Sequence, residues 1–399
     1  MSILYQANDP LTWNEFYSRK LEKGNVSKRE LSGLLEFIEN EEYSEVAACL
    51  FSRPFSHPRI SEINKKGSSK KRAVFTFPRK ENYLLKLIVH LLYRYDGIFP
   101  DNLYSFRQNV SVKDAIRRIA NWGQLKSSYC YKVDIHDYFN SVDTEIMSDI
   151  IRKRIDSLDH PLSELLIKLI SDPFAIKNGV ITKCKKGVMA GMPVSGFLAD
   201  LYLIELDEWF ASRGIMYLRY SDDIVVFAES SEKIDLYEKT IKDFLQSKHL
   251  EVNPKKEVRT LPGEPVEFLG FRFEGNDITI SRISVEKLKD KIRRKARALY
   301  RWRIKRSLSP DKAIRGLIKH FNRKFYNNPI HNEMTWCRWY FPVITTDKAL
   351  MEIDRYMIQY IRYIPTGRHS KINYRLRYDK IKALGYVSLV NSYYKYKNQ

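Results

Sequence analysis

The residues most suited to carry out chemistry are two adjacent carboxylates, Asp222 and Asp223, in the segment Tyr220-Ser-Asp-Asp223. Apolar runs flank this segment, Gly214–Arg219 before it and Ile224–Ala228 after it, and the pattern predicts two strands joined by a tight polar turn. Two carboxylates in one turn repel each other unless a cation is bound there, and a divalent metal would supply that charge. The alternative is an ordinary hairpin turn, whose geometry Asp tolerates.

A third acid, Asp134, lies near the end of the predicted strand Tyr129–Ile135, 88 positions before Asp222. Two strands of one sheet can bring these carboxylates together. Three acids on adjacent strand ends can hold two Mg²⁺ ions about 3.5–4 Å apart, the arrangement that polymerases and nucleases use for phosphoryl transfer. Mg²⁺ suits such a site because it takes a few carboxylates together with substrate phosphates. The three acids therefore predict a site for nucleotidyl transfer.

The rest of the pattern predicts an α+β fold that positions these acids. Helices are expected over residues 1–60, 82–99, 144–170, 196–212 and 231–249 and from 284 onward, and strands over 73–77, 129–135, 266–273 and 277–280. The basic segment Asn64–Arg72 is predicted to be a loop. A doubly wound dinucleotide fold is not expected, because no G-x-G-x-x-G motif follows a strand and no P-loop is present. We expect a sheet with helices on one side.

The net charge is concentrated at one end of the chain. Residues 287–399 hold 28 lysines and arginines against 7 aspartates and glutamates, whereas residues 1–286 hold 41 of each, so the whole excess of +21 lies in the last 113 residues. Aromatic residues alternate with these cations, as in Tyr300–Arg303, Trp336–Phe341 and Tyr374–Tyr378. Because cations neutralise phosphates and rings stack on bases, this segment is expected to bind nucleic acid. The alternative is a set of solvated basic helices with aromatic core faces.

Composition restricts the environment of the protein. No run of 18 apolar residues is present, which predicts no membrane-spanning helix, and Met1–Pro10 lacks the pattern of a signal peptide. The four cysteines are far apart and form no C-x-x-C pair, so neither a zinc site nor a disulfide framework is expected. These features predict a cytoplasmic protein that does not associate with membranes.

Five segments resemble, in order and spacing, the motifs of the reverse transcriptase family. They are Lys132–Phe139, Gly191–Ser195, Tyr220–Asp223, Asn253–Lys256 and Phe268–Phe271, within a match from about residue 65 to 275. The resemblance implies a right-hand polymerase fold. Its expected parts are an N-terminal helical extension (1–60), fingers (61–128), a palm with an antiparallel sheet (129–283) and a basic, mainly helical thumb or C-terminal domain (284–399).

The resemblance implies roles for the acids and for a lysine. Asp134, Asp222 and Asp223, with Ile135 beside them, match the positions that bind two Mg²⁺ ions, for which Mn²⁺ can substitute. Lys256 matches a lysine suggested to protonate the leaving pyrophosphate, and the alternative is a solvated lysine.

The resemblance also implies substrate contacts. Phe139 matches the bulky residue that blocks a ribose 2′-hydroxyl and so selects dNTPs. Arg72, with Lys71, matches the fingers residue that contacts the triphosphate, and Arg107 matches a second fingers arginine of prokaryotic relatives. Gly191, Ser195 and Tyr220 belong to the segments that position nucleotide and template. The alternatives without a substrate role are core packing for Phe139, a solvated basic loop for Lys71 and Arg72, and an ordinary turn at Gly191.

The resemblance therefore implies an RNA-directed DNA polymerase that uses dNTPs, an RNA template or noncoding RNA, and a DNA product. The chain departs from many relatives at Ala190-Gly191 and Ser195-Gly196, which puts contacts near Ala190 in question. It most resembles prokaryotic defence-associated reverse transcriptases, including a subtype that works as two polymerases, so a second reverse transcriptase or self-association is a candidate partnership. Retron-type and group II intron-like enzymes are the alternative. An RNA-dependent RNA polymerase and a catalytically weak RNA-binding protein are alternatives of other kinds, and priming from a tyrosine hydroxyl is a further hypothesis.

Overall fold

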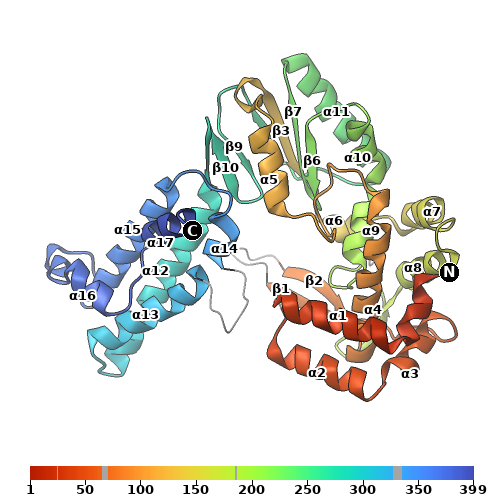
Figure 1. The fold of residues 1–399 in the computed structure, drawn as a ribbon, viewed down its shortest axis with the longest axis horizontal. Helices are drawn as coiled ribbons and strands as arrows, with labels where there is room; N and C mark the ends of the chain where they lie inside the picture. Colours follow the sequence, from red (N-terminus) through yellow and green to blue (C-terminus); the bar gives the residue numbers. More distant parts are fainter. Residues whose placement is uncertain (25, 65–70, 185–186, 327–334) are drawn as a thin grey trace. The chain divides into compact units, whose positions relative to one another are not determined.

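The computed structural model describes residues 1–24, 26–64, 71–184, 187–326 and 335–399, without the side chains of Asn64 and Arg72 (Figure 1). The chain divides into two compact units. The first comprises Met1–Ala115 and Ser127–Pro262, and the second comprises Ile116–Lys126 and Gly263–Gln399. The predicted α+β class is confirmed, while the four-part division with boundaries at 60, 128 and 283 stays a prediction.

The first unit begins with helices packed around aromatic side chains. These elements are η1 (Ile3–Asn8), α1 (Pro10–Lys23), α2 (Lys28–Glu39), α3 (Tyr43–Ala47), η2 (Ala48–Leu50), α4 (Arg79–Leu92) and η3 (Tyr93–Ile98). Trp13 is fully buried, and its ring contacts those of Phe16, Phe37 and Tyr43. Burial of large rings dominates the stability of such a cluster.

A four-stranded sheet follows, in the order β2-β1-β4-β5. Its strands are β1 (Arg59–Asn64), β2 (Lys71–Thr76), β4 (Phe174–Lys177) and β5 (Val180–Lys183), and β1 pairs antiparallel with β2. The predicted helix up to residue 60 was wrong at its end, because β1 begins at Arg59. The loop predicted over 64–72 was wrong at its two ends, because Asn64 belongs to β1 and Lys71 and Arg72 belong to β2. Its residues 65–70 lie outside the part of the chain that the structure describes. The main chain of β1 forms a regular ladder with β2 from Arg59 to Asn64.

A second four-stranded antiparallel sheet carries the predicted acids, in the order β6-β7-β3-β8. It consists of β3 (Tyr129–Asp134), β6 (Tyr217–Tyr220), β7 (Asp223–Ala228) and β8 (Val258–Thr260). Helix α11 (Ser231–Ser247) packs against β3 and β7, and α10 (Ile204–Ala211) packs against β6 (Figure 1). The residues Ile224–Ala228 of β7 are all buried, which explains their continuous apolar run.

The remaining helices of the first unit are short. They are α6 (Tyr138–Ser141), α7 (Thr144–Ile155), α8 (His160–Ser171) and α9 (Ser195–Tyr202), with α5 (Val112–Asn121) and η4 (Leu125–Ser127) spanning the unit boundaries. The helical stretch predicted over 144–170 consists of two helices, because Asp159 caps the N-terminus of α8 and Pro161 occupies its first turn. The segment 196–212 likewise divides at Leu203 into α9 and α10.

The second unit combines a small sheet with a group of basic helices. Its elements are β9 (Val266–Phe268), β10 (Phe271–Glu274), β11 (Asp277–Ile280), α12 (Arg282–Lys305), α13 (Pro310–Phe325), α14 (Trp336–Tyr340), α15 (Lys348–Tyr363), η5 (Lys371–Arg375), α16 (Tyr378–Ala383) and α17 (Leu389–Lys397). Helix α12 packs against α13 and α15, and α15 packs against α17.

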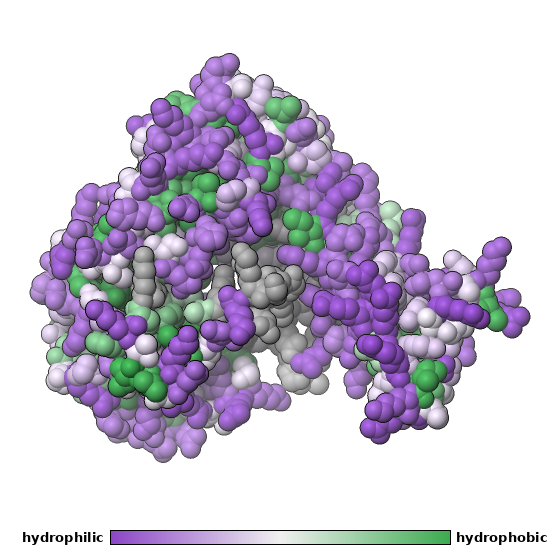
Figure 2. Space-filling view, turned by 180° about the vertical axis from the view of Figure 1, so that it is seen from behind, coloured by the Kyte–Doolittle hydropathy of each residue, from purple (hydrophilic) through white to green (hydrophobic). Residues whose placement is uncertain are grey.

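The buried face of α12 is apolar, whereas the surface of this unit seen in Figure 2 is mostly hydrophilic. Val285, Leu288, Ile292 and Ala296 are buried on one face of the helix. Mostly hydrophilic side chains cover the face of the unit seen in Figure 2. Among the described residues, we find no helix with the length and apolar character needed to cross a bilayer.

Candidate active site

The three predicted acids lie together at one edge of the β6-β7-β3-β8 sheet. Antiparallel pairing places Asp134 directly opposite Asp223. Tyr220 pairs with Asp223 across the hairpin, so Ser221 and Asp222 form its two-residue turn, with Ser221 at a φ of 58°. One carboxylate oxygen from each of Asp134, Asp222 and Asp223 lies within 4.8 Å of the others.

The hairpin tip is fixed to its neighbours by main-chain hydrogen bonds. The Ile135 N–H donates to the carbonyl of Asp222 at 3.1 Å, and the Asn253 N–H donates to the carbonyl of Asp134 at 2.8 Å. The side-chain amide of Asn253 also donates to the Asp134 carboxylate at 3.0 Å. The acids are thus held by strands and by the 251–256 turn, which limits their freedom to move apart.

The electrostatics of this cluster favour a bound cation. Burial, followed by the negative charges of Asp222 and Asp134, raises the pKa of Asp223 to about 6. Lys256 forms an ion pair with Asp134. Partial burial disfavours the charged Lys256, but the bond to Asp134 and the nearby acids outweigh this effect and raise its pKa. Three clustered carboxylates are the hard oxygen donors that Mg²⁺ and Mn²⁺ bind, so the residues fit a divalent metal.

A cavity of about 750 Å³ opens beside the acids. Asp134, Ile135, Asp222 and Lys256 line one part of it, and Lys71 and Ala73 of strand β2 line another. Phe139 and Ala190 also line it, with the 135–140 segment and Lys255. A volume of this size falls within the range of about 300–1,000 Å³ that is typical of small-molecule sites.

Two of the substrate-contact candidates are placed at this cavity. The Phe139 ring meets Tyr138 and Phe106 edge-on, with centroid distances of 5.8 Å and 6.4 Å. Lys71 is half exposed and pairs with Glu62 at 3.1 Å. The main chain of Arg72 pairs with Ile63 in the β1–β2 ladder, but its side chain lies outside the part of the chain that the structure describes.

Gly191 and Ser195 shape the wall and do not line the cavity themselves. Gly191 has a φ of 104°, and a Cβ there would lie 2.5 Å from Val74 Cγ1 and 2.8 Å from the carbonyl of Phe75. The neighbouring carbonyl of Ala190 accepts a hydrogen bond from the Phe75 N–H at 2.8 Å. Glycine is therefore needed for close approach to strand β2. Ser195 is buried, with its hydroxyl 2.7 Å from the carbonyl of Met189.

Arg107 and Tyr220 also lie away from the cavity lining. Arg107 donates to the carbonyls of Pro100 at 3.0 Å and Leu103 at 3.3 Å, so it holds its own segment in shape. Tyr220 ends strand β6, and burial, with the charge of Asp200, raises its pKa. The substrate contacts of Arg107 and Tyr220 stay predictions. The hydrogen bonds of Arg107 give it a structural role within its own segment.

A buried ionic network behind the hairpin was missed in the sequence. Arg219 of β6 is fully buried, and its guanidinium forms a bidentate pair with Asp207 of α10, with Nε 2.8 Å from Oδ1. The same guanidinium donates to the carbonyl of Ser221 at 3.2 Å, and Tyr217 donates to Asp207 at 2.9 Å. The network therefore connects helix α10 directly to the turn that carries Asp222. The sequence did contain a signal for this network, because charged residues such as Arg219 and Asp207 occur inside strongly apolar segments.

Ser105 and Asp200 complete this support. The Ser221 N–H donates to the Ser105 hydroxyl at 2.8 Å, and that hydroxyl donates to Asp200 at 2.6 Å. Burial raises the pKa of Asp200 to about 8, against the opposing effect of Arg219 and the Ser105 bond. Neither Ser105 nor Asp200 is exposed, so both act by positioning the hairpin.

Comparison with known proteins identifies the family. The model of the family "Reverse transcriptase (RNA-dependent DNA polymerase)" matches residues 63–273, more than half of the chain. The chain therefore belongs to the reverse transcriptase family, as its motifs predicted, and the α+β unit that carries the acids is its right-hand polymerase fold.

Two curated relatives are similar to parts of the chain. The chain is 26% identical over 198 residues to the COX1/OXI3 intron 2 protein of Saccharomyces cerevisiae, covering 49% of this chain and 23% of that protein. It is 24% identical over 246 residues to the Retron Ec86 reverse transcriptase of Escherichia coli, covering 59% of this chain and 68% of that enzyme. The chain thus spans less than a quarter of the yeast relative.

Solved telomerase structures are similar at a lower level. Apo telomerase from Candida tropicalis has a TM-score of 0.47 and 14% identity, covering 83% of this chain and 59% of that one. Telomerase from Candida albicans, in complex with a fragment of telomeric RNA, has a TM-score of 0.45 and 12% identity, covering 87% and 68%.

Proposed function

We propose that this chain is an RNA-directed DNA polymerase that adds dNTPs by two-metal-ion nucleotidyl transfer. The observation that carries the proposal is the convergence of Asp134, Asp222 and Asp223 at the edge of a 750 Å³ cavity. Family membership adds the reaction class. Divalent metal ions bound by these acids would activate a 3′-hydroxyl and neutralise charge that develops on the phosphates.

Residues around the acids support defined roles. Lys71, on the β2 wall, would hold phosphate oxygens of the incoming nucleotide, because this exposed residue lines the same cavity as the acids. Phe139 would exclude a ribose 2′-hydroxyl. Lys256 is charged and within contact of Asp134, and it would deliver a proton to the departing pyrophosphate.

Phosphate-rich partners follow from the charge of the second unit. The excess of basic residues after position 286 supports binding of an RNA template and a DNA product. We place the activity in antiphage defence with an associated noncoding RNA, a proposal that rests on the motif resemblance. A retron-type or group II intron-like activity is the second candidate, favoured by the two curated relatives.

Primer extension tests the polymerase activity. Purified protein is incubated with an RNA template, a DNA primer, Mg²⁺ and labelled dNTPs or NTPs. We expect template-dependent DNA, loss of synthesis with EDTA and recovery with Mg²⁺ or Mn²⁺. Absence of any DNA product from active-site-intact protein, with every primer and with the protein's own co-purifying RNA, would refute the proposal.

Sugar selection has its own pair of variants. Phe139→Ala should gain NTP incorporation relative to dNTP incorporation, because it opens the cavity wall. Phe106→Ala is the matched control, since this ring contacts Phe139 but does not line the cavity. An unchanged NTP-to-dNTP ratio in Phe139→Ala would count against its role as a gate.

The physiological template requires a different measurement. Sequencing the nucleic acid that co-purifies with the protein should recover one dominant noncoding RNA and its complementary DNA. A mixture of abundant cellular RNAs, without a matching DNA, would contradict a dedicated template.

A further inference from the structure

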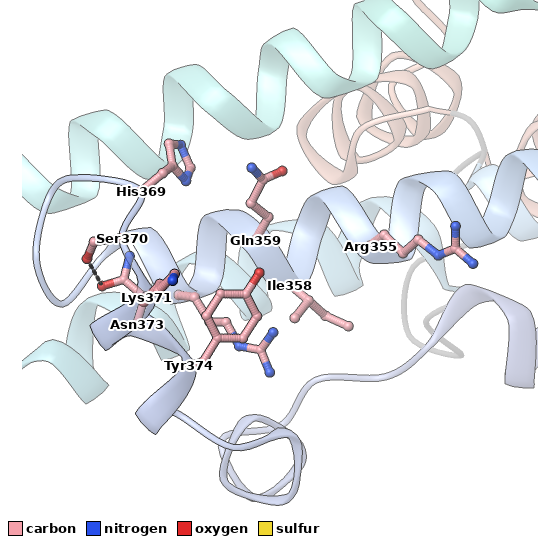
Figure 3. A pocket seen from close by; sticks show the side chains of 9 residues that line it. Arg355, Ile358, Gln359, His369, Ser370, Lys371, Asn373 and Tyr374 are labelled. Carbon is pink, nitrogen blue, oxygen red and sulfur yellow. Dashed lines mark hydrogen bonds between the residues drawn. The ribbon is translucent and has the colours of Figure 1, made fainter.

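A second cavity lies within the C-terminal unit, between helix α15 and the segment that follows it. Its volume is about 660 Å³. One wall is a single face of α15, with Arg355, Ile358, Gln359 and Arg362 at positions i, i+3, i+4 and i+7. The other wall is the segment 369–374, which includes the first turn of η5. Figure 3 shows these side chains around the cavity, with Tyr374 close to Ile358 and Arg355 farther along the helix.

Internal hydrogen bonds hold the second wall in place. Asn373 is buried, and its side-chain amide donates to the carbonyl of Arg368 at 2.6 Å and accepts from Thr366 at 2.8 Å. Arg362 Nε donates to the carbonyl of Leu376 at 3.2 Å, which ties the helix to the end of η5. The His369 ring lies 5.1 Å from that of Tyr360. The cavity is therefore formed before any ligand arrives, and less ordering entropy is lost on binding.

The lining combines cations with one exposed aromatic ring. Arg355, Arg362 and Lys371 contribute positive charge, and no Asp or Glu belongs to the lining among the described residues. Two acids precede the lining residues on this helix, and both have partners elsewhere. Asp354 accepts from Tyr386 at 2.7 Å and Ser388 at 2.6 Å, and Glu352 pairs with Lys289. The cationic lining thus attracts an anion.

Tyr374 gives the cavity a stacking surface. The residue is 68% exposed, and the guanidinium of Arg362 lies 4.8 Å from the centroid of its ring. The other face of such a ring is available to a planar group, and the fixed guanidinium adds a cation next to it. Gln359 is exposed on the opposite wall and offers both a donor and an acceptor. Ile358 is the one aliphatic side chain of the lining, so an apolar peptide has little to bury.

We infer, on the basis of the proposed function, that this cavity binds one unpaired nucleotide of a single-stranded RNA. Its base stacks on Tyr374, its phosphates are held by Arg355 and Lys371, and Gln359 contacts the base edge. A duplex would not bind in this way, because neighbouring bases cover the faces that would have to stack on Tyr374. The site would hold the template or noncoding RNA independently of the catalytic acids.

Fluorescence anisotropy with a labelled twelve-nucleotide oligouridylate and the full chain tests the stacking contact. Tyr374→Ala should weaken binding about tenfold, because loss of one base–aromatic stack costs on the order of 1–3 kcal/mol. Tyr374→Phe should bind like the unaltered protein. Ile372→Ala is the matched control, since Ile372 is exposed in the same 3₁₀ helix but does not line the cavity. Equal affinity for Tyr374→Ala and Ile372→Ala would overturn the inference.

The salt dependence of the same assay tests the phosphate contacts. Replacing Arg355 and Lys371 together by Gln should reduce the slope of log affinity against log salt by about 1.4, because each phosphate contact on a single strand contributes about 0.7. The matched control replaces Lys395 and Lys397 of α17 together by Gln. It removes the same amount of charge outside the cavity and should change the slope less. An equal slope for the two double variants would overturn the assignment. So would a twelve-residue oligoglutamate that competes as well as unlabelled RNA, because it would indicate an acidic peptide as ligand.

Primer extension with a preformed RNA–DNA hybrid at saturating concentration separates this inference from the polymerase proposal. Tyr374→Ala should retain full synthesis there, because the hybrid bypasses single-strand capture. If the unaltered protein synthesises no DNA but its binding of oligouridylate still depends on Tyr374, the polymerase proposal is refuted. The inference that the cavity binds single-stranded RNA is then supported. Loss of synthesis by Tyr374→Ala on the saturated hybrid would refute an independent role for the cavity.

Discussion

Ser105 offers a way to separate the positioning of the catalytic hairpin from contact with substrate. Its fully buried hydroxyl accepts from the Ser221 N–H at 2.8 Å and donates to Asp200 at 2.6 Å. Ser105→Ala removes both bonds and puts nothing in their place. A buried group left without its partner costs about 1–3 kcal/mol, so we expect the free energy of unfolding to fall by about 2–4 kcal/mol.

Two assays measure the consequence. Urea unfolding gives the stability loss, and single-nucleotide incorporation gives kcat and KM for the dNTP. We expect kcat to fall, because the turn that carries Asp222 loses its support, and KM to stay close to its original value, because Ser105 does not line the nucleotide cavity.

The matched control is Ser148→Ala in helix α7. The Ser148 hydroxyl donates to the Thr144 carbonyl of its own helix at 2.7 Å, and alanine is a better helix former. This variant should change the unfolding free energy by less than about 0.5 kcal/mol. Equal unfolding curves and equal incorporation rates for Ser105→Ala and Ser148→Ala would refute the positioning role.

Three further variants test the surrounding structure. Arg219→Met leaves the buried Asp207 without its cation and should cost about 3–5 kcal/mol in urea unfolding, whereas a loss under about 1 kcal/mol would contradict a buried pair. The pKa of Asp200 is about 8 in the folded chain against a usual 3.8, so the folded state keeps a proton that the unfolded state has lost. The stability that Asp200 contributes is present in full below pH 3.8 and is lost as pH rises through 8. Asp200→Asn should therefore flatten this decline in the urea midpoint. A pH profile of the urea midpoint equal to that of the unaltered protein would contradict the raised pKa. Gly191→Ala should unfold at lower urea concentration than Gly214→Ala, because a Cβ at Gly191 would lie 2.5 Å from a β2 side chain whereas Gly214 has open space around it; equal midpoints would contradict the close packing.

Local patterns were sufficient to predict the strands that carry the acids. The apolar runs around Tyr220–Asp223 and the run that ends at Asp134 specify short buried strands, and their pairing follows once both belong to one sheet. The break at Asp159 was also readable, because a capping aspartate followed by Pro161 starts a new helix. The helical stretch predicted over 144–170 did not include this break, because apolar periodicity alone does not reveal a helix cap.

Pairing between distant elements could not be predicted in the same way. The partner of Arg219 lies on a preceding helix, and the choice of Asp207 depends on how α10 packs against β6. The position of Ser105 under the hairpin depends on a segment more than a hundred residues earlier in the chain. The Arg107 contact with carbonyls of its own segment likewise depends on the loop conformation, which residue types do not specify.

Replacement of Asp222 tests the central claim most directly. Asp222→Asn keeps the size of the side chain but removes a metal-binding charge at the hairpin tip. Asp235→Asn on α11 removes a carboxylate that pairs with Arg259 and does not line the cavity. With an RNA template, DNA primer, dNTPs and Mg²⁺, the rate of DNA synthesis should fall at least about a hundredfold for Asp222→Asn, in line with loss of several kcal/mol of transition-state stabilisation. Asp235→Asn should retain the original rate. DNA synthesis by Asp222→Asn at the rate of Asp235→Asn would contradict the assignment of this turn as the catalytic centre.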